Sequence, residues 1–533
     1  MFKNHPKGLL PAALANMGER FGYYIMNAVL LLFLISKFGL SEETGGVIYS
    51  FFYAGIYVLS LVGGIIADRT KNYKGTIQTG LMVMAIGYIL LSIPILATPE
   101  NHIWLLIFTC VALFFIAFGN GLFKGNLQAI VGQMYDNLEK EAALKGDEAL
   151  KDAKAKRDPG FQIFYVFINI GGLIAPFVAP LLRSWWLGTK NLLYNAKLPE
   201  LCHKYLAFGQ DMVASNASEE QLLNAPQLYD NLIQLTEKVS GTTIGTEQLN
   251  SFCTNYLDIF NTGVHYSFIA SVAAMLISLA IFFSYKKIFP DPIKVKKEVE
   301  NYTQEEKIQM ASEIRQRIYA LFAVLGVAVF FWFSFHQNGT SLSLFARDFV
   351  VTSKIPPEIW QAINPFFVIV LTPIIIWLFA RMKAKGKEPS TPKKIAIGMG
   401  IASIAFLFMA IISKMNGYPS GTEFRGMEEA VSEGLKAGPW VLIVLYFFLT
   451  VAELFISPLG LSFVSKVAPK HLLGFCQGLW LSATAVGNGL LWVGPLLYNK
   501  FPIWICWTVF VVLCALSMIV MLSMVKWLER VAK

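Results

Sequence analysis

The sequence predicts an all-α membrane protein with twelve transmembrane helices, and three observations support this. Of the 533 residues, 55% are hydrophobic and 15% are charged, whereas soluble domains average about 25% charged residues. Apolar runs of roughly 20 residues, long enough to cross a bilayer as a helix, recur along the whole chain. The basic residues behind the net charge of +9 gather in the short connectors between these runs, so the charge does not indicate a nucleic-acid partner.

The predicted spans centre near residues 25, 56, 86, 115, 172, 275, 328, 370, 403, 450, 484 and 515. If they alternate in direction, the connectors rich in Lys and Arg all fall on one side of the membrane. Because basic loops stay in the cytoplasm, both termini are predicted to be cytoplasmic. Glu19 and Arg20 interrupt the first run, which argues against a cleavable signal peptide. We expect a multi-pass protein of the cell (inner) membrane.

The spans divide into two groups of six. Residues 1–286 are predicted to form an N-terminal six-helix bundle, residues 287–314 a cytoplasmic linker, and residues 315–533 a C-terminal six-helix bundle. Six spans, a charged linker and six more spans are the outline of the major facilitator fold, in which a ligand binds near the midplane between the halves.

An extra extracytoplasmic loop domain is predicted at about residues 187–262, between the fifth and sixth spans. It is polar and contains Cys202 and Cys253. On an oxidising side of the membrane these residues would form a disulfide, and otherwise they are two free thiols. The sequence leaves both alternatives open.

The first span carries a polar face. Asn16, Arg20, Tyr23 and Asn27 lie on one side of the predicted helix, with Glu19 beside Arg20. A charge at bilayer depth costs several kcal/mol, so such residues face a partner or a cavity. Two interpretations remain: a self-paired Glu19–Arg20 that joins helices, or the lining of a path for a polar ligand.

Charged residues also occur in or next to the fourth and second spans. Lys124 lies between glycines and apolar residues in the fourth span, which predicts a fixed cation facing a cavity; the alternative is a lysine that snorkels to the interface. Asp68 and Arg69 follow two glycines at the end of the second span. This resembles the motif that major facilitators use to hold cytoplasmic helix ends together, while the alternative is a simple interfacial arginine.

The ordered set of motifs is more specific than any one of them. Each is a short polar pattern inside a span, and the set comprises Glu19-Arg20-Phe-Gly-Tyr23-Tyr24, Lys124, Phe164-Tyr165-Val-Phe-Ile-Asn169-Ile-Gly171, Asn364-Pro365, Ala452-Glu453-Leu-Phe-Ile-Ser457-Pro458 and Gly478-Leu-Trp480. Together they resemble the proton-coupled oligopeptide transporter family. The resemblance covers nearly all of the membrane portion but not residues 187–262.

The resemblance implies import of di- and tripeptides by alternating access, driven by a proton gradient, with no cofactor or metal. A peptide is a zwitterion, so Arg20 and Lys124 would hold its carboxylate and Glu453 its ammonium group. The residues expected to contact the peptide backbone or line its path are Tyr23, Tyr24, Tyr57, Asn169 and Asn364. Trp480 would form the wall of a side-chain pocket.

Proton coupling and gating involve further residues. Glu19, Glu453 and His336 are the candidates for proton coupling. Asp68, Arg69, Arg347 and Asp348 are the candidates for gating. The chain departs from the family pattern in having Asn16 for a glutamate, Asn27 for an arginine and His336 for a glutamate, which leaves the proton stoichiometry open.

Two other functions fit the sequence less well than peptide transport. A transporter of nitrate or another small organic solute would share the fold but leave Glu453 without an ammonium partner. A membrane enzyme is not expected, because the spans contain no His-Glu-x-x-His, paired-Asp or nucleophile-elbow motif. The expected partners are small peptides, protons and the lipid bilayer, with the monomer as the functional unit and no nucleic acid.

Overall fold

The protein is described here from a computed structural model that covers residues 5–213, 219–290, 304–351, 356–467 and 473–531. Within these ranges the regular structure is helical, apart from one isolated bridge between Val350 and Ala437. This confirms the all-α prediction.

The N-terminal half contains six long helices. They are α1 (Leu9–Phe38), α2 (Glu42–Thr70), α3 (Tyr73–Ser92), α4 (His102–Ala143), α5 (Asp147–Thr189) and α8 (Leu249–Ser284). The central helix is α1, which packs against α5 and α8, while α3 packs against α4 and α8. Because α1 is enclosed by other helices, its polar face meets protein rather than lipid.

The C-terminal half repeats this plan with more interruptions. Its elements are α9 (Gln304–Phe335), η2 (His336–Gly339), α10 (Ser341–Asp348), η3 (Pro357–Ala362), α11 (Ile363–Ala384), α12 (Thr391–Met415), α13 (Gly421–Gly426), α14 (Glu429–Leu435), α15 (Trp440–Val467), α16 (Leu473–Gly489), α17 (Val493–Lys500) and α18 (Ile503–Val531). Within the described ranges, 11 helices are long and apolar enough to cross a membrane. The predicted span near residue 484 is α16, whose 17 described residues are near the lower limit for spanning.

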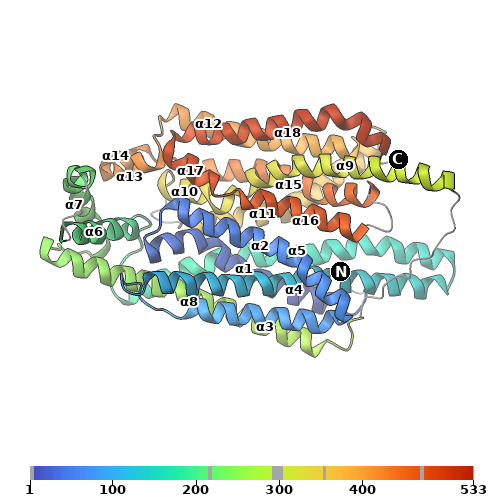
Figure 1. Cartoon of the computed structure of the whole chain (residues 1–533), viewed down its shortest axis with the longest axis horizontal. Coiled ribbons are helices and arrows are strands. Elements are labelled where there is room, and N and C mark those ends of the chain that lie inside the picture. The colour runs from blue at the N-terminus through green and yellow to red at the C-terminus, as the bar shows by residue number, and fades with distance from the viewer. Residues whose placement is uncertain (1–4, 214–218, 291–303, 352–355, 468–472, 532–533) are drawn as a thin grey trace.

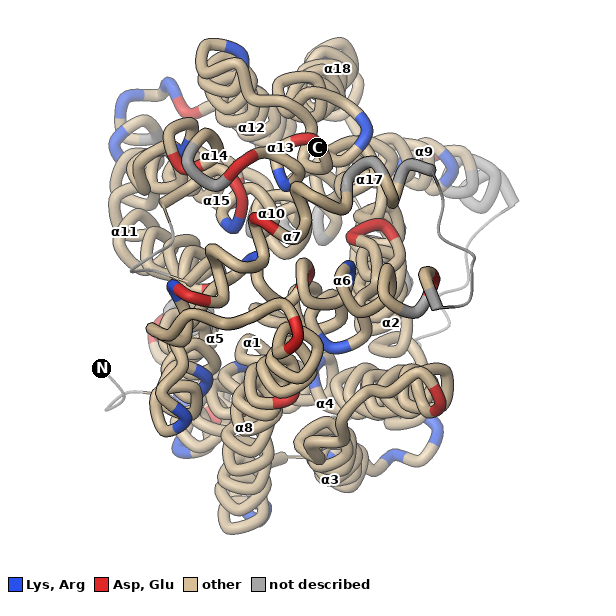
Figure 2. Tube along the Cα trace, turned by 90° about the vertical axis from the view of Figure 1, so that its left-hand side faces the viewer, with Lys and Arg blue, Asp and Glu red and all other residues tan. Residues whose placement is uncertain are grey.

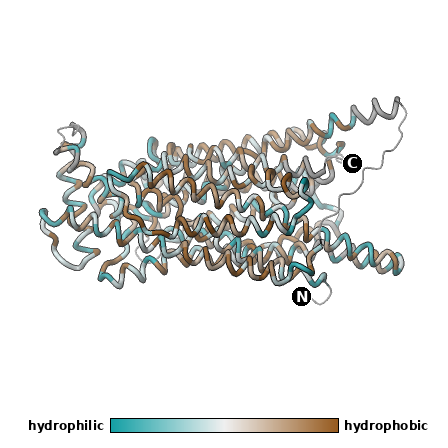
Figure 3. The backbone as a smooth tube through the Cα atoms, turned by 60° about the horizontal axis from the view of Figure 1, so that its bottom comes forward, coloured by the Kyte–Doolittle hydropathy of each residue, from teal (hydrophilic) through white to brown (hydrophobic). Residues whose placement is uncertain are grey.

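The two halves lie side by side along the length of the bundle (Figure 1). They meet where α2 packs against α16 and where α5 packs against α11 and η3. Hydrophobic residues form a broad middle zone, and hydrophilic residues gather toward both ends (Figure 3). Both chain ends lie at the same end of the bundle (Figure 1).

The predicted loop domain is helical and lies at the opposite end of the bundle, which we call the insertion end (Figure 1). It contains α6 (Leu198–Val213), α7 (Glu219–Ser240) and η1 (Thr246–Gln248). The next helix, α8, begins at Leu249, inside the predicted range 187–262, because its first turns bury Cys253, Tyr256 and Leu257. Cys202 and Cys253 are both buried free thiols, and their side chains interact with each other. The central part of the predicted linker 287–314 lies outside the described residues.

Candidate functional site

The first charged group on the polar face of α1 is the pair Glu19–Arg20. Arg20 donates from Nε to Glu19 Oε2 over 2.5 Å and from Nη2 to Oε1 over 2.7 Å. Asn120 of α4 donates to the same Glu19 Oε1 over 2.6 Å. Glu19 is fully buried, so these bonds supply the partners that its charge requires. The self-paired arrangement therefore exists, and the Nη1 group of Arg20 remains outside the pair.

Lys124 is a second cation in the same half, and close helix packing positions it. A side chain added at Gly63 or Gly121 would collide with the backbone of the facing helix, so the two glycines let α2 and α4 approach closely. This contact places the Lys124 ammonium 4.5 Å from the centre of the Tyr57 ring. Among the described residues, no carboxylate forms an ion pair with Lys124.

The acidic group of the site comes from the other half. Glu453 of α15 accepts a hydrogen bond at Oε2 from Asn364 Nδ2 of α11, over 2.9 Å. Asn364 also donates to Thr450 Oγ1 over 3.0 Å, which fixes the orientation of the amide. In the part of the chain that the structure describes, no basic side chain pairs with Glu453.

The cationic and acidic groups are linked through two tyrosines of the N-terminal half. Tyr24 and Tyr57 are each within electrostatic range of both Arg20 and Glu453. A side chain added at Gly172 of α5 would touch both Tyr24 of α1 and Pro365 of α11, at 3.1–3.2 Å. The halves therefore meet closely beside the site, with positive charge on one side and negative charge on the other.

Three other predicted binding residues make contacts within their own half. The Tyr23 hydroxyl donates to Asn27 Oδ1 over 3.3 Å, and the Asn169 amide donates to the Tyr165 carbonyl of its own helix over 3.0 Å. The Trp480 indole lies against α15 at Gly460, where any side chain would collide with the ring. Trp480 is only 3% exposed and joins α15 to α16. Its predicted role as a pocket wall stays a prediction.

His336 begins η2, directly after α9. Its Nδ1 lies 2.5 Å from Asn488 Oδ1 of α16. Its ring stacks on Trp332 and also meets Tyr53 of the N-terminal half, with centroid distances of 5.0 and 4.9 Å. Lys124 is within electrostatic range. His336 is therefore a hydrogen-bonded residue at the boundary between the halves, close to the charged site.

The predicted gating residues lie at the two ends of the bundle. Near the chain ends, the Tyr73 hydroxyl of α3 donates to the Asp68 carboxylate of α2, and Arg69 is exposed beside it. At the insertion end, Arg347 donates to its neighbour Asp348 over 2.8 Å and to Glu42 of α2 over 2.9 Å. The Arg347–Asp348 pair thus contacts the opposite half.

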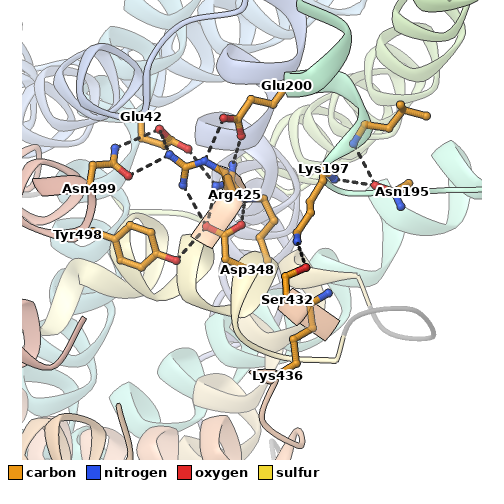
Figure 4. A network of polar contacts seen from close by, with 12 residues as sticks. Glu42, Asn195, Lys197, Glu200, Asp348, Arg425, Ser432, Lys436, Tyr498 and Asn499 are labelled. Atoms are coloured by element: carbon orange, nitrogen blue, oxygen red, sulfur yellow. Dashed lines mark hydrogen bonds and ion pairs between the residues drawn. The ribbon is translucent and has the colours of Figure 1, made fainter. Parts of the chain in front are cut away.

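The pair belongs to a larger group that we call the rim cluster, comprising Glu42, Glu200, Arg347, Asp348 and Arg425. Figure 4 labels its members other than Arg347. Arg425 of α13 donates to Glu42 and to Asp348, each over 3.2 Å. Tyr498 donates to Asp348, and Asn499 donates to Glu42 and accepts from Arg425. The view onto the insertion end shows acidic and basic residues close to the middle of the bundle (Figure 2).

A second ion pair joins the halves at the insertion end. Arg183 of α5 donates from Nη1 to Glu358 Oε1 of η3 over 2.7 Å, and both side chains are buried. The Arg183 guanidinium also lies 4.2 Å from the centre of the Tyr194 ring. Sequence reasoning missed Arg183, Glu358, Glu42, Glu200 and Arg425. In the sequence, each of these residues is a charged residue at the end of a span or in a loop. Such a residue is equally typical of an exposed surface, so its burial in an ion pair could not be predicted.

Two bundles of long apolar helices that pack along their length, with Lys124 in one and Glu453 in the other, have the architecture of a multi-pass membrane transporter. The POT family model matches residues 74–209 and 291–505. The chain belongs to the POT family.

The relatives agree with this assignment. The chain is 28% identical to dipeptide and tripeptide permease B of Salmonella typhimurium over 90% of its own length and 84% of the relative. It is 30% identical to a permease of the same name from Shigella dysenteriae, with 89% and 83% covered. It is 27% identical to the peptide transporter YePEPT of Yersinia enterocolitica, with 91% and 87% covered.

Solved structures confirm the fold. A crystal structure of the peptide transporter POT with sulfate superposes with a TM-score of 0.68 at 21% identity, covering 100% of this chain and 96% of that one. A mutant of POT in complex with alafosfalin gives the same TM-score at 20% identity, with the same coverage. The chain is a multi-pass membrane protein with the fold of these transporters.

Proposed function

We propose that this chain imports di- and tripeptides together with protons, by alternating access. The observation that carries the proposal is the arrangement of Lys124 in one half and Glu453 in the other. Neither has an ion-pair partner among the described residues, and Tyr57 lies close to both. An unpaired charge inside a membrane protein is costly, so these two groups are suited to a ligand that carries both charges. The names of the relatives, which are peptide permeases, support the same cargo.

The proposed binding mode follows from the charges. The peptide carboxylate binds Lys124 and the free Nη1 side of Arg20, and its ammonium group binds Glu453. Tyr24 and Tyr57 line the space between these groups, with Asn364 orienting the acid. Tyr23, Asn169 and Trp480 support this lining from the surrounding helices. Because a peptide contacts both halves at once, its binding draws them together, which couples binding to the conformational change.

Proton coupling is assigned first to Glu453. A carboxylate at this depth needs either a proton or a cationic partner, so a proton and a peptide ammonium group act on the same acid. Glu19 already has Arg20 and Asn120 as partners, and it takes part when the peptide competes for Arg20. His336 is the third candidate, because it lies within electrostatic range of Lys124.

The gating assignment uses both ends of the bundle. We place the insertion end outside the cell membrane and the chain ends in the cytoplasm, with the monomer as the transporting unit. In this orientation, Arg347 and Asp348 belong to an outer gate, and their ion pairs with Glu42 and Arg425 support this assignment. Asp68 and Arg69 belong to the cytoplasmic gate, where Asp68 links α2 to α3. The proton gradient supplies the energy, and no cofactor is required.

Uptake by the purified protein in proteoliposomes tests this function. We expect accumulation of a labelled dipeptide when the outside is acidic, and little uptake without a pH gradient or with a protonophore. Unlabelled di- and tripeptides should compete, whereas nitrate should not. Uptake that ignores the gradient would contradict proton coupling, and inhibition by nitrate alone would favour the alternative cargo, for which Glu453 has no ammonium group to bind.

A further inference from the structure

The α6–α7 hairpin is attached to the N-terminal half. On α6, the His203 ring donates from Nε2 to the Ser36 carbonyl near the end of α1, over 2.8 Å. This ring fits against Gly39, whose φ of +62° and missing side chain leave room for it. The neighbouring Cys202 thiol is buried against Cys253 of α8. Two helices of the N-terminal half therefore hold α6.

From this attachment α6 reaches the opposite half. Glu200 accepts from Arg425 Nε at Oε1 over 3.0 Å, and its Oε2 lies 3.6 Å from Arg347 Nη1. Both arginines belong to the C-terminal half. Both arginines thus contact two acids of the N-terminal half, Glu42 from α2 and Glu200 from the hairpin. Figure 4 shows Arg425 between these two acids.

Three weaker contacts extend the same bridge. The Lys197 ammonium, just before α6, lies 3.4 Å from Ser432 Oγ of α14 and 4.7 Å from the centre of the Phe424 ring of α13. On α7, Asn231 donates to the Met427 carbonyl over 3.4 Å. The hairpin therefore touches the connection from α13 to α14 at several points.

Glu200 is an additional carboxylate in the rim cluster, beyond those needed to balance the two arginines. Arg347 and Arg425 are already balanced by Glu42 and Asp348, two charges against two. Glu200 adds a third carboxylate, and Lys204 on its own helix, 2.9 Å away, balances it. The cluster does not need Glu200 for neutrality, so its contribution is a mechanical link between the hairpin and the arginines.

We propose that the α6–α7 hairpin is a strap fixed to the N-terminal half, which clasps the C-terminal half through Glu200 and Lys197 and slows opening of the insertion end. This role rests on the proposed alternating access. When the insertion end opens, α6 moves with α1 and α8, and the contacts from Glu200 to both arginines break. The strap thereby determines the population of the conformation in which the insertion end is open.

Hydrogen–deuterium exchange on the purified full-length protein, without any peptide, tests the strap. In Glu200→Gln we expect roughly tenfold faster exchange in α13 and α10, because one charge-assisted link to each arginine is lost. The matched control is Glu247→Gln, which removes an exposed acid from η1 of the same insertion and should leave both helices unchanged. Unchanged exchange in Glu200→Gln would overturn the strap. The readout needs no transported cargo, so it stays informative if the proposed function fails.

Cross-linking tests the same idea by preventing the strap from separating from α14. Lys197→Cys combined with Ser432→Cys places one thiol on the strap and one on α14, for a cleavable, membrane-impermeant bifunctional thiol reagent. We expect the cross-link to stop uptake and a reductant to restore it. Each single variant, treated in the same way, controls for reaction at the native cysteines, because Cys202 and Cys253 are as buried as Ser432 in this arrangement. Uptake at the untreated rate in the cross-linked protein would show that the strap and α14 need not separate.

Discussion

The central site and the rim cluster use charged side chains in opposite ways. At the centre, Lys124 lies against a tyrosine ring and Glu453 accepts from an amide, so neutral groups hold both charges. In the rim cluster, Arg347 and Arg425 are each bonded to more than one carboxylate. Breaking a buried ion pair costs about 3–5 kcal/mol, because it leaves a charge without a partner. Charges that the protein pairs itself hold a conformation, whereas charges that it leaves unpaired remain available to a ligand.

Lys124 provides the most severe test of this contrast. Lys124→Ala should lower pH-driven uptake of a labelled dipeptide by about 100-fold or more, because a charge-assisted contact to the peptide carboxylate is lost. Lys124→Arg keeps the charge and should retain part of the activity. Membrane expression, measured by immunoblotting, should match the wild type in both variants. Uptake near the wild-type rate in Lys124→Ala would refute the assigned role.

Glu453→Gln should also abolish uptake driven by a pH gradient, since an amide neither titrates nor attracts an ammonium group. The variant side chain retains an oxygen that accepts from Asn364, so the thermal unfolding midpoint should stay close to that of the wild type. Fluorescence-monitored unfolding measures this second quantity. A gradient-driven rate like that of the wild type would exclude Glu453 from both binding and proton coupling.

The ion pair between Arg183 and Glu358 tests whether paired charges stabilise the closed insertion end. Arg183→Met leaves Glu358 charged and buried, which should destabilise the closed insertion end by about 3–5 kcal/mol. The double variant Arg183→Met with Glu358→Met removes both charges and should recover most of that loss. Hydrogen exchange in η3 and in the adjoining part of α5 reports the difference. If the double variant is as open as the single one, the two residues do not act as a pair.

A smaller effect is expected from pH on the strap. Burial alone would raise the pKa of Glu200, but Arg425, Lys204 and Arg347 together hold it well below its ordinary value. A carboxylate with a lowered pKa keeps its stabilising effect above its ordinary pKa and loses it only as the pH falls through the lowered value. Glu200 should therefore stay ionised at about pH 5, and exchange protection of α13, corrected for intrinsic rates, should match that at about pH 7. A marked loss of protection near pH 5 that is absent from Glu200→Gln would contradict this.

At alkaline pH, the titration of Lys197 should change the stability of the closed insertion end. Burial lowers its pKa to about 8, with Asp348 opposing the shift. The buried, closed arrangement thus favours the neutral amine, and raising the pH through about 8 should stabilise closure until the open-state lysine also loses its proton. Lys197→Met should remove this pH dependence from the exchange of α14.

The sequence predicted what depends on local pattern. The polar face of α1, the cation at Lys124 and the acid at Glu453 each interrupt an apolar run, and that contrast is visible without coordinates. The partners of Arg347 were not predictable in this way, because Glu42 and Arg425 lie far from it in the chain and resemble ordinary charges at a helix end or in a loop. The packing of Trp480 on Gly460 was missed for the same reason, since it depends on how α15 and α16 cross.

The smallest expected effect concerns His336, which shares features with the paired groups of the rim cluster and with the unpaired charges of the central site. Like the residues of the rim cluster, it has a hydrogen-bond partner within the protein, Asn488. Like Glu453, it belongs to the surroundings of the central site, because Lys124 is within electrostatic range. If it takes part in proton coupling, His336→Gln should shift the pH dependence of uptake while changing the maximal rate by less than about tenfold. Asn488→Ala is the matched control, because it removes the hydrogen-bond partner but keeps the imidazole, and it should alter the pH profile less than His336→Gln does. An unchanged pH profile in His336→Gln would place the residue with the packing groups, and the proton would then have to be carried by Glu453 and Glu19.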